Sequence, residues 1–361
     1  MRPRPQFPCL DWMKAIGIAL VVYGHVAHAT TVPLTPPVYL KQFGVTLFVF
    51  ATGFTLARDR KPAGTVILSR VLPLYLYGLL VAAVVALTGA STGTGLALSN
   101  LLPFFGGVNV LLDHFPANPS TWYVGTYLHL LLLWAWLFRG VRVQWWMIAA
   151  AAVVEIIARA LLLAFAGPYI AYMFFTSWIT VFTLGMLNGA REDVSSTSSP
   201  LPFALVLLGG GFVWAKFAWA LGLTPTFPLM TVDGWDSLTS AFTVSIGASA
   251  LYFGVTALVF EVTRRLPAPS VVRLVARNSL IVFLAHMPIF FALNPVLVGA
   301  GFSYFSRVAI ELAVCGVALT GVSELISRVG AADALRARLL AWHGNGGMQA
   351  LRPALGRRSS S

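Results

Sequence analysis

The first apolar run reads LDWMKAIGIALVVYGHVAHA, from Leu10 to Ala29, and it decides the class of fold. Its length approaches the roughly 20 residues that an α-helix needs to cross a hydrocarbon core. Asp11, Lys14 and His25 lie within it, and ionisable groups inside a membrane helix are costly enough to need a reason. Because a cleavable leader has an uncharged apolar core, we interpret this run as a retained first membrane helix.

The composition of the whole chain also indicates that it lies in a membrane. Of the 361 residues, 58% are hydrophobic and 10% are charged, whereas an ordinary soluble domain is about a quarter charged. So few charges could not cover a soluble fold of this size, and most of the chain is expected to lie in lipid. The net charge of +12 does not indicate nucleic-acid binding, because the arginines fall in short links between apolar runs, where they determine topology. The two cysteines, Cys9 and Cys315, indicate no disulfide framework.

Ten apolar runs result when the chain is cut at proline, glycine and charge clusters. A further apolar segment, residues 96–112, is broken by Pro103, Gly106 and Gly107, and it is expected to lie outside the membrane or to re-enter it. The ten runs are Leu10–Ala29, Val38–Ala57, Val66–Leu87, Trp122–Phe138, Val143–Phe165, Tyr169–Gly189, Leu201–Leu221, Leu238–Val262, Val275–Leu297 and Tyr304–Ile326.

The orientation follows from the lysines and arginines, because cytoplasmic links carry an excess of them. Alternate links differ in their content of lysine and arginine. The set of links that is poor in these residues contains Arg307, and it also contains Asp113, Asp233 and Asp236. An even number of helices with both termini in the cytoplasm fits this alternation. The richer set holds Arg2, Arg4, Arg58, Arg60, Lys61, Arg70, Arg139, Arg142, Arg191, Arg264, Arg265, Arg273 and the tail residues Arg328, Arg336, Arg338, Arg352, Arg357 and Arg358.

These patterns predict an all-α membrane protein, a bundle of about ten transmembrane helices with both termini cytoplasmic. The membrane domain is expected to cover residues 1–330. Residues 331–361 form a basic tail interrupted by glycines and ending in three serines. We expect this tail to be flexible in the cytoplasm or to lie on anionic lipid headgroups.

Lys14 and His25 are eleven positions apart in the first run, which is about three helical turns. They therefore project from nearly one face and stand about 16 Å apart along the helix axis. Gly24, next to His25, permits close approach of another helix or of a ligand. A histidine is the usual side chain for taking a proton from a hydroxyl. The alternative is a structural histidine that is bonded to a neighbouring carbonyl.

Further ionisable residues lie inside the apolar runs. Glu155 and Arg159 are four apart on one helix, so a structural pair is the favoured interpretation. Lys216 and Glu311 are expected near the outer interface, where long side chains reach water.

His286 lies in the ninth run, two residues before Pro288. The proline lacks an N–H, so it should free the carbonyl of Leu284 and kink the helix. A kink beside a histidine can line a cavity, and packing alone is the alternative.

The first run also has an ordered series of positions, Leu10, Asp11, Lys14 and His25. This series resembles the opening of the membrane acyltransferase-3 family. The family's basic residue is usually arginine, and Lys14 keeps the charge but lacks the planar fork that binds phosphate or carboxylate in a bidentate manner.

Three later stretches are similar to the same family, and the resemblance extends in order from Leu10 to about Pro288. The second run contains Gly44, Val45, Leu47, Phe48, Gly53 and Phe54, with Thr52 at the family's serine position and Thr46 at a common aspartate. The third run opens with Arg70, Pro73 and Tyr75, with Ile67 where a second arginine often stands. Later positions that resemble the family are Trp122, Tyr123, Asn278, Ser279, Leu280 and His286.

The resemblance implies a polytopic O-acyltransferase that moves an acyl group, acetyl in the first instance, from cytoplasmic acyl-CoA to a hydroxyl of a glycan or another extracytoplasmic acceptor. The form of the first run leans toward the branch that resembles sugar O-acetylases. Acyl-CoA is then the donor substrate, and no separate cofactor, metal ion or nucleic acid is expected. The implied location is the inner (plasma) membrane of a bacterium, as a multi-pass protein.

The resemblance and the chemistry together suggest roles for individual residues. His25 is the candidate general base, with transient acylation of the same ring as the alternative. Asp11 caps the first helix or orients Lys14. His25, Lys14 and Asp11 together form the candidate catalytic set. The candidates for binding the phosphates of acyl-CoA are Arg70, Arg58, Arg60 and Lys61, the last three having orientation alone as their alternative role. The candidates for a cavity or acceptor site are His286, Trp122, Tyr123 and Ser279.

A secondary transporter or flippase is the competing class of function, because it also needs polar groups inside a helical bundle. Labelled acyl-CoA separates the two classes. An enzyme leaves label on a product in detergent, and a carrier does not.

Overall fold

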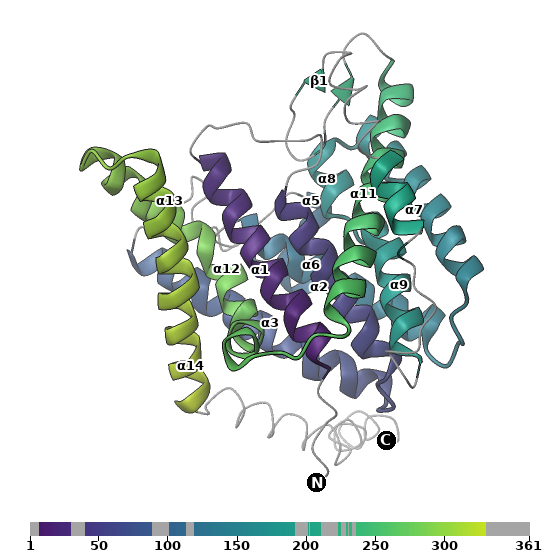
Figure 1. The fold of residues 1–361 in the computed structure, drawn as a ribbon, viewed down its shortest axis with the longest axis horizontal. Helices are drawn as coiled ribbons and strands as arrows, with labels where there is room; N and C mark the ends of the chain where they lie inside the picture. Colours follow the sequence, from purple (N-terminus) through teal and green to yellow (C-terminus); the bar gives the residue numbers. More distant parts are fainter. Residues whose placement is uncertain are drawn as a thin grey trace, which may run out of the picture.

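The computed structural model describes residues 7–29, 40–88, 101–112, 119–191, 201, 203–210, 223–224, 229, 231–232 and 236–329. The long helices run between the same two ends of one bundle, with the start of α1 at one end and a short strand pair at the other (Figure 1). The α-helices are α1 (Pro8–Ala29), α2 (Leu40–Ala57), α3 (Ala63–Thr88), α4 (Leu101–Gly106), α5 (Asn109–Leu112), α6 (Trp122–Leu133), α7 (Trp145–Phe165), α8 (Pro168–Met173), α9 (Ile179–Gly189), α11 (Ser237–Thr263), α12 (Ser270–Gly299), α13 (Tyr304–Ala313) and α14 (Leu319–Val329).

Short segments of other geometry complete the described part of the chain. Residues 203–210 are helical as well. The 3₁₀ segments are η2 (Pro119–Thr121) and η4 (Phe175–Trp178), and the π segments are η3 (Trp134–Phe138) and η5 (Val314–Ala318). Strand β1 (Leu223–Thr224) pairs antiparallel with β2 (Thr231–Val232), in the register Leu223 opposite Val232.

Seven described helical stretches are long and apolar enough to cross a membrane, namely α1, α2, α3, α7, α11, α12 and the stretch Tyr304–Glu324. Each coincides with one of the ten apolar runs, so the all-helical membrane class is confirmed. The run Trp122–Phe138 is a shorter apolar helix, and most of the seventh run lies outside the described residues. The count of ten spans therefore stays a prediction. The apolar segment left out of that count contains only the short helices α4 and α5 in its described part.

The sixth run, Tyr169–Gly189, differs from the single helix that hydropathy suggests. It consists of α8, η4 and α9, with Phe174 extended at φ −70° and ψ 141° between the first two. The break leaves backbone groups without helical partners, and two buried side chains of α7 satisfy them. Arg159 Nη2 donates to the carbonyl of Ser177 at 2.5 Å, and the Thr180 N–H donates to Glu155 Oε2 at 2.9 Å.

Glu155 and Arg159 form the structural pair that their spacing indicates, at 2.6 Å and with 1% of each side chain exposed. Ser249 of α11 joins them, because it accepts from Arg159 Nη1 at 2.8 Å and donates to Glu155 Oε1 at 2.7 Å. A buried ion pair is stable only when its remaining hydrogen-bonding groups are also satisfied. Here those groups bind the broken helix and α11, so the pair holds three elements together.

The expectation that the Glu311 side chain reaches water is wrong, whereas Lys216 lies outside the described residues. Glu311 is fully buried at 0% exposure on α13, one turn before η5, and so it does not reach water. Neither of its carboxylate oxygens has a hydrogen-bond partner among the described residues. Helix α13 packs against α1 and α12, so a side chain on it can be buried by protein and not only by lipid.

Helix α2 is the centre of the bundle, with α1 on one side and α9 on another. Glycines allow the close approach of α9. A Cβ atom at Gly185 would lie 2.2 Å from the carbonyl oxygen of Phe50, and one at Gly189 would lie 2.2 Å from that of Phe54. Small residues at this four-residue spacing bring membrane helices into backbone contact. The closely packed α2–α9 unit fixes the end of α2, from which the next link begins.

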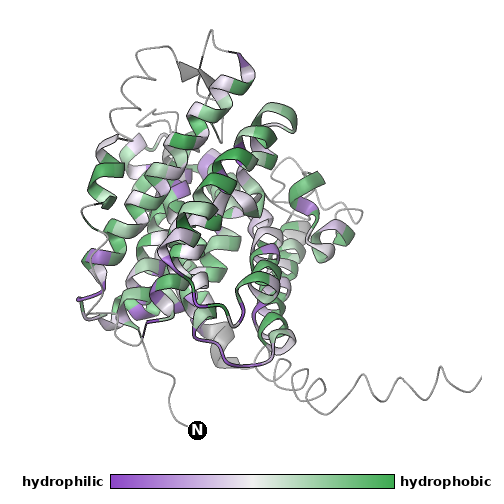
Figure 2. Cartoon of the chain, turned by 90° about the vertical axis from the view of Figure 1, so that its right-hand side faces the viewer, coloured by the Kyte–Doolittle hydropathy of each residue, from purple (hydrophilic) through white to green (hydrophobic). Residues whose placement is uncertain are grey.

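The links that are rich in arginine gather at one end of the bundle. Arg58, after α2, donates to the carbonyl of Arg191, after α9. Arg139, after η3, donates to the carbonyl of Lys61 at 3.5 Å. Trp12 Nε1 in α1 donates to the carbonyl of Pro267, between α11 and α12, at 3.0 Å. Figure 2 colours links at this end as hydrophilic against largely hydrophobic helices. The grouping that the charge pattern predicts is thus present, and we keep the assignment of this end to the cytoplasm as a prediction.

Candidate active site

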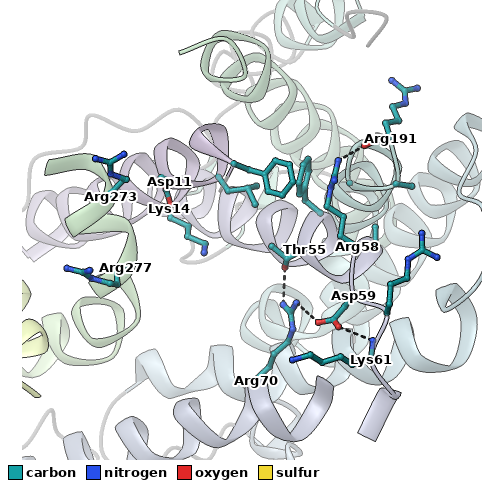
Figure 3. A pocket seen from close by; sticks show the side chains of 17 residues that line it. Asp11, Lys14, Thr55, Arg58, Asp59, Lys61, Arg70, Arg191, Arg273 and Arg277 are labelled. Carbon is teal, nitrogen blue, oxygen red and sulfur yellow. Dashed lines mark hydrogen bonds and ion pairs between the residues drawn. The ribbon is translucent and has the colours of Figure 1, made fainter. Parts of the chain in front are cut away.

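A cleft of about 940 Å³ opens at this basic end, between α1, α2, α3, α12 and the segment after α9 (Figure 3). Eight basic and two acidic side chains line it, so its electrostatic character is strongly cationic. All four predicted donor-binding residues are among them, together with Lys14 and Asp11. The charged lining consists of Asp11, Lys14, Arg58, Asp59, Arg60, Lys61, Arg70, Arg191, Arg273 and Arg277.

Arg70 is the cation that is most firmly oriented in this cleft. Its guanidinium donates to Thr55 Oγ1 at 2.9 Å and forms an ion pair with Asp59 at 3.5 Å (Figure 3). Asp59 in turn accepts from the backbone N–H of Lys61 at 3.3 Å, so the link between α2 and α3 is tied to α3. About a fifth of the Arg70 side chain stays exposed (21%), which leaves part of its fork available to a ligand.

Arg58 has a different environment. Its guanidinium lies over the rings of Phe7, at 4.3 Å, and Phe54, at 5.3 Å, and it donates to the carbonyl of Arg191. Desolvation against these groups lowers the pKa of Arg58, an effect that the Cys9 sulfur partly opposes. An arginine remains charged after such a shift. Arg58 therefore joins the end of α2 to the end of α9, in addition to contributing charge to the cleft.

Sequence reasoning missed several residues of the cleft. Thr55 and Asp59 were not singled out, although they orient Arg70, and Arg191 and Arg273 were assigned to topology alone. Desolvation, and then the charge of Arg264, lowers the pKa of Arg191. Arg277 was not considered, although its position four residues after Arg273 places both on one face of α12. Arg277 forms an ion pair with Glu324 of α14 at 2.7 Å.

A smaller cavity of about 240 Å³, which we call the inner pocket, adjoins the cleft. Lys14, Thr55, Arg70 and Arg277 line both spaces, so these four residues mark the junction. The inner pocket is otherwise walled by aromatic, aliphatic and small polar side chains of α2, α3, α6 and α12. Those that matter below are Phe48, Thr52, Tyr123, Ser279 and Phe283.

Two of the four predicted cavity residues, Tyr123 and Ser279, therefore lie beside the predicted donor residues. Trp122 does not line either of these spaces in the described part of the chain. It packs instead against Tyr172, with ring centroids 5.0 Å apart, and against Trp178 at 6.2 Å. Trp178 stacks on Tyr252 at 5.2 Å. The position of Trp122 is thus that of a core residue that supports the neighbouring Tyr123.

His25 and His286 lie side by side, with ring centroids 4.9 Å apart and planes tilted by 54°. The sequence placed both histidines in helices but did not pair them. Phe283 connects them to the inner pocket, because its ring lies 5.1 Å from that of Tyr123 and 6.0 Å from that of His286. His286 is 1% exposed, and His25 is half-buried.

Helix α1 joins these parts of the site. It is continuous from Pro8 to Ala29, with Asp11 in its first turn as expected. Lys14 stands at the junction of the cleft and the inner pocket, and His25 follows about 16 Å further along the axis. The face predicted from their spacing therefore runs from a cationic cleft to a pair of imidazoles. Such an arrangement can bind a polyanion at one end and transfer a proton at the other.

The family model of the acyltransferase-3 family, which describes an acyltransferase domain, matches residues 7–325. No curated protein and no solved structure matches the chain. The matched region contains the cleft, the inner pocket and both histidines. A match over most of the chain, in a bundle with seven candidate membrane spans, shows that the protein is a membrane acyltransferase and belongs to the acyltransferase-3 family.

Proposed function

We propose that the protein transfers an acyl group, acetyl in the simplest case, from cytoplasmic acyl-CoA to a hydroxyl of a glycan or a similar acceptor outside the cytoplasm. The observation that carries this proposal is the cationic cleft that adjoins an aromatic pocket. The paired histidines line neither space, and Phe283 of the pocket wall lies between the pocket and the His286 ring. A donor with a polyanionic end and a narrow reactive arm fits that sequence of environments.

The cleft supports binding of the nucleotide end of the donor. Coenzyme A carries several phosphate charges, and arginines bind phosphate through charge-assisted, often bidentate hydrogen bonds. Arg70 is pre-oriented by Thr55 and Asp59. Arg273 and Arg277 also line the cleft from α12, although in the view of Figure 3 their guanidinium groups point away from Arg70. We assign the phosphate contacts first to Arg70, with Arg60 and Lys61 at the rim.

The inner pocket supports binding of the pantetheine arm. Its volume of about 240 Å³ suits a narrow chain better than a nucleotide, and it begins where Lys14 and Arg70 meet the cleft. The arm would extend along Tyr123 and Ser279, with the thioester directed to the ring of Phe283. On that side the ring of Phe283 lies 6.0 Å from the ring of His286.

His25 is the group that we assign to proton transfer. As general base it takes the proton of the acceptor hydroxyl, and the oxygen attacks the thioester carbonyl. The C–S bond breaks, the acyl group forms an ester with the acceptor, and the thiolate takes the proton from His25 to give free coenzyme A. A variant in which the His25 ring first carries the acyl group uses the same position and gives the same products. Lys14 positions the donor, and Asp11 favours the helix start.

The proposal includes a topology. Both termini and the cleft face the cytoplasm, about ten helices cross an inner plasma membrane, residues 1–330 form the membrane domain, and residues 331–361 form a basic tail. The link charges support this arrangement.

The test is transfer of labelled acetyl from acetyl-CoA by purified protein in detergent, with a panel of small sugars and oligosaccharides as acceptors. We expect label in a covalent product with the wild type and a loss of at least about 100-fold with His25→Ala, the scale of general base catalysis. Mass spectrometry of surface glycans, with and without the protein, identifies the natural acceptor. His25→Ala with full transfer would remove the catalytic assignment. No product with any acceptor in detergent, together with uptake of a substrate by vesicles, would establish the transporter instead.

A further inference from the structure

The histidine pair lies where three helices meet. His25 belongs to α1 and His286 to α12, and their ring centroids are 4.9 Å apart. Helix α2 closes this region, because a Cβ atom at Gly24 would lie 2.7 Å from the backbone nitrogen of Lys41. A ring nitrogen lies about 1 Å from the ring centre, so this centroid separation allows facing nitrogens to come within hydrogen-bonding distance.

The hydrogen bonds of His286 fix its protonation. Nδ1 lies 2.7 Å from the carbonyl oxygen of Phe283 and 3.2 Å from that of Val282. A carbonyl oxygen can only accept, so Nδ1 must carry a hydrogen and donate it. In a neutral ring Nε2 then has no hydrogen and can only accept. The second nitrogen of His286 is therefore an acceptor with a defined role.

That acceptor has no protein partner in the part of the chain that the structure describes. Nε2 of His286 is buried and makes no hydrogen bond there, and the side chain is 1% exposed. A histidine that only stabilises its own helix would be complete with the Nδ1 bond. A buried acceptor without a donor is unfavourable, and such groups occur where a site is completed during function.

We propose that His286 is a positioning residue of the transfer reaction, whose Nε2, unbonded in the described structure, accepts an N–H of His25 once the substrates complete the site. This inference rests on the proposed function. The contact holds the His25 ring so that its other nitrogen faces the acceptor hydroxyl. When His25 takes the hydroxyl proton, the imidazolium has two N–H groups, and Nε2 of His286 accepts one of them. The proton later passes to the thiolate of coenzyme A, and His286 keeps its own Nδ1 hydrogen throughout.

Two substitutions test the roles of the two nitrogens of His286 separately. His286→Asn keeps a donor at the place of Nδ1 and removes Nε2. Two asparagines in this chain already donate to the carbonyl four residues earlier, as the variant would: Asn278 to Leu274 at 2.8 Å and Asn188 to Leu184 at 2.9 Å. His286→Gln places an amide oxygen near the position of Nε2, so it restores an acceptor for His25.

The experiment measures kcat and KM for acetyl-CoA and for the acceptor with wild type, His286→Asn and His286→Gln in detergent, after thermal unfolding has shown which variants are folded. We expect kcat of His286→Asn to fall about 100-fold with both KM values within about threefold. We expect kcat of His286→Gln to be at least tenfold higher than kcat of His286→Asn. A structural role would lower the amount of folded protein and would not distinguish asparagine from glutamine in kcat.

Each outcome decides the inference. Full kcat in folded His286→Asn, or equal losses in both folded variants, overturns it and leaves the proposed function intact. If His286→Asn does not fold, His286→Gln decides alone, since near-wild-type kcat supports the acceptor role and a 100-fold loss contradicts it. Absence of transfer by the wild type overturns the proposed function, and this inference with it.

Discussion

Arg70 is the residue at which the structure defines a donor contact most sharply. Thr55 and Asp59 hold its guanidinium at the junction of the cleft and the inner pocket. Loss of a charge-assisted hydrogen bond costs about 1.5–3 kcal/mol, which corresponds to roughly 10- to 100-fold in an equilibrium constant. We therefore expect Arg70→Ala to raise KM for acetyl-CoA at least tenfold and to leave KM for the acceptor nearly unchanged, as measured by steady-state kinetics.

Arg139 provides the control for this substitution. It lies in a link at the same end of the bundle but does not line the described cleft, so Arg139→Ala should leave KM for acetyl-CoA within about twofold. Arg70→Lys, which keeps the charge but not the planar fork, should fall between wild type and alanine. Equal KM values for Arg70→Ala and the wild type would assign Arg70 to topology alone.

The sequence located those site residues that occupy motif positions near helix ends. Lys14 and Arg70 could be placed because each stands in the first two turns of its apolar run, at the predicted cytoplasmic end. Thr55 and Arg277 could not, because they reach the cleft only through the packing of α2 with α3 and α12. The pairing of His25 with His286 was also beyond sequence reasoning, since no spacing within one helix records a contact between two helices.

At the scale of single elements, the apolar runs predicted where helices lie better than they predicted whether a helix is continuous. Helices α1, α2, α7 and α11 agree with their runs to within a few residues. The break at Phe174 was invisible, because apolar residues continue on both sides of it. What permits that break is a polar pair on another helix, Glu155 and Arg159.

The close contact between α2 and α9 yields a prediction for Gly185. A Cβ atom there would meet the carbonyl oxygen of Phe50 at 2.2 Å, so Gly185→Ala must separate two helices that are both buried. Overpacking of this kind costs about 1–3 kcal/mol. We expect the variant to unfold at a lower temperature in detergent and to lose activity in proportion to folded protein, as followed by thermal unfolding and transfer assays.

Gly321 on α14 is the appropriate comparison, because no atom lies within 4 Å of a Cβ atom placed there. Gly321→Ala should leave stability unchanged or slightly raised, since alanine has the higher helix propensity. If Gly185→Ala were as stable as Gly321→Ala, the two helices would be free to separate, and the α2–α9 unit would not fix the link that carries Asp59.

At the scale of the whole molecule, the proposed reaction requires a donor from one side of the membrane and an acceptor from the other. The grouping of basic links at one end of the bundle follows from contacts such as that of Arg139 with Lys61. Its assignment to the cytoplasm follows from the excess of positive charge in those links. The cleft opens at that end, and His25 lies toward the opposite end of α1.

Helix α12 allows this orientation to be measured with one pair of substitutions. It spans 30 residues, with exposed Ser270 at the basic end and exposed Ala300 just beyond the other. Ser270→Cys and Ala300→Cys are small changes, and native Cys9 and Cys315 are buried, so background labelling by a maleimide that cannot cross membranes should be low. We expect Ala300→Cys to react in intact cells and Ser270→Cys to react only after permeabilisation. The reverse pattern would place the cationic cleft outside the cytoplasm, where no pool of acyl-CoA is available to it, and labelling of both sites in intact cells would show that α12 does not cross the membrane.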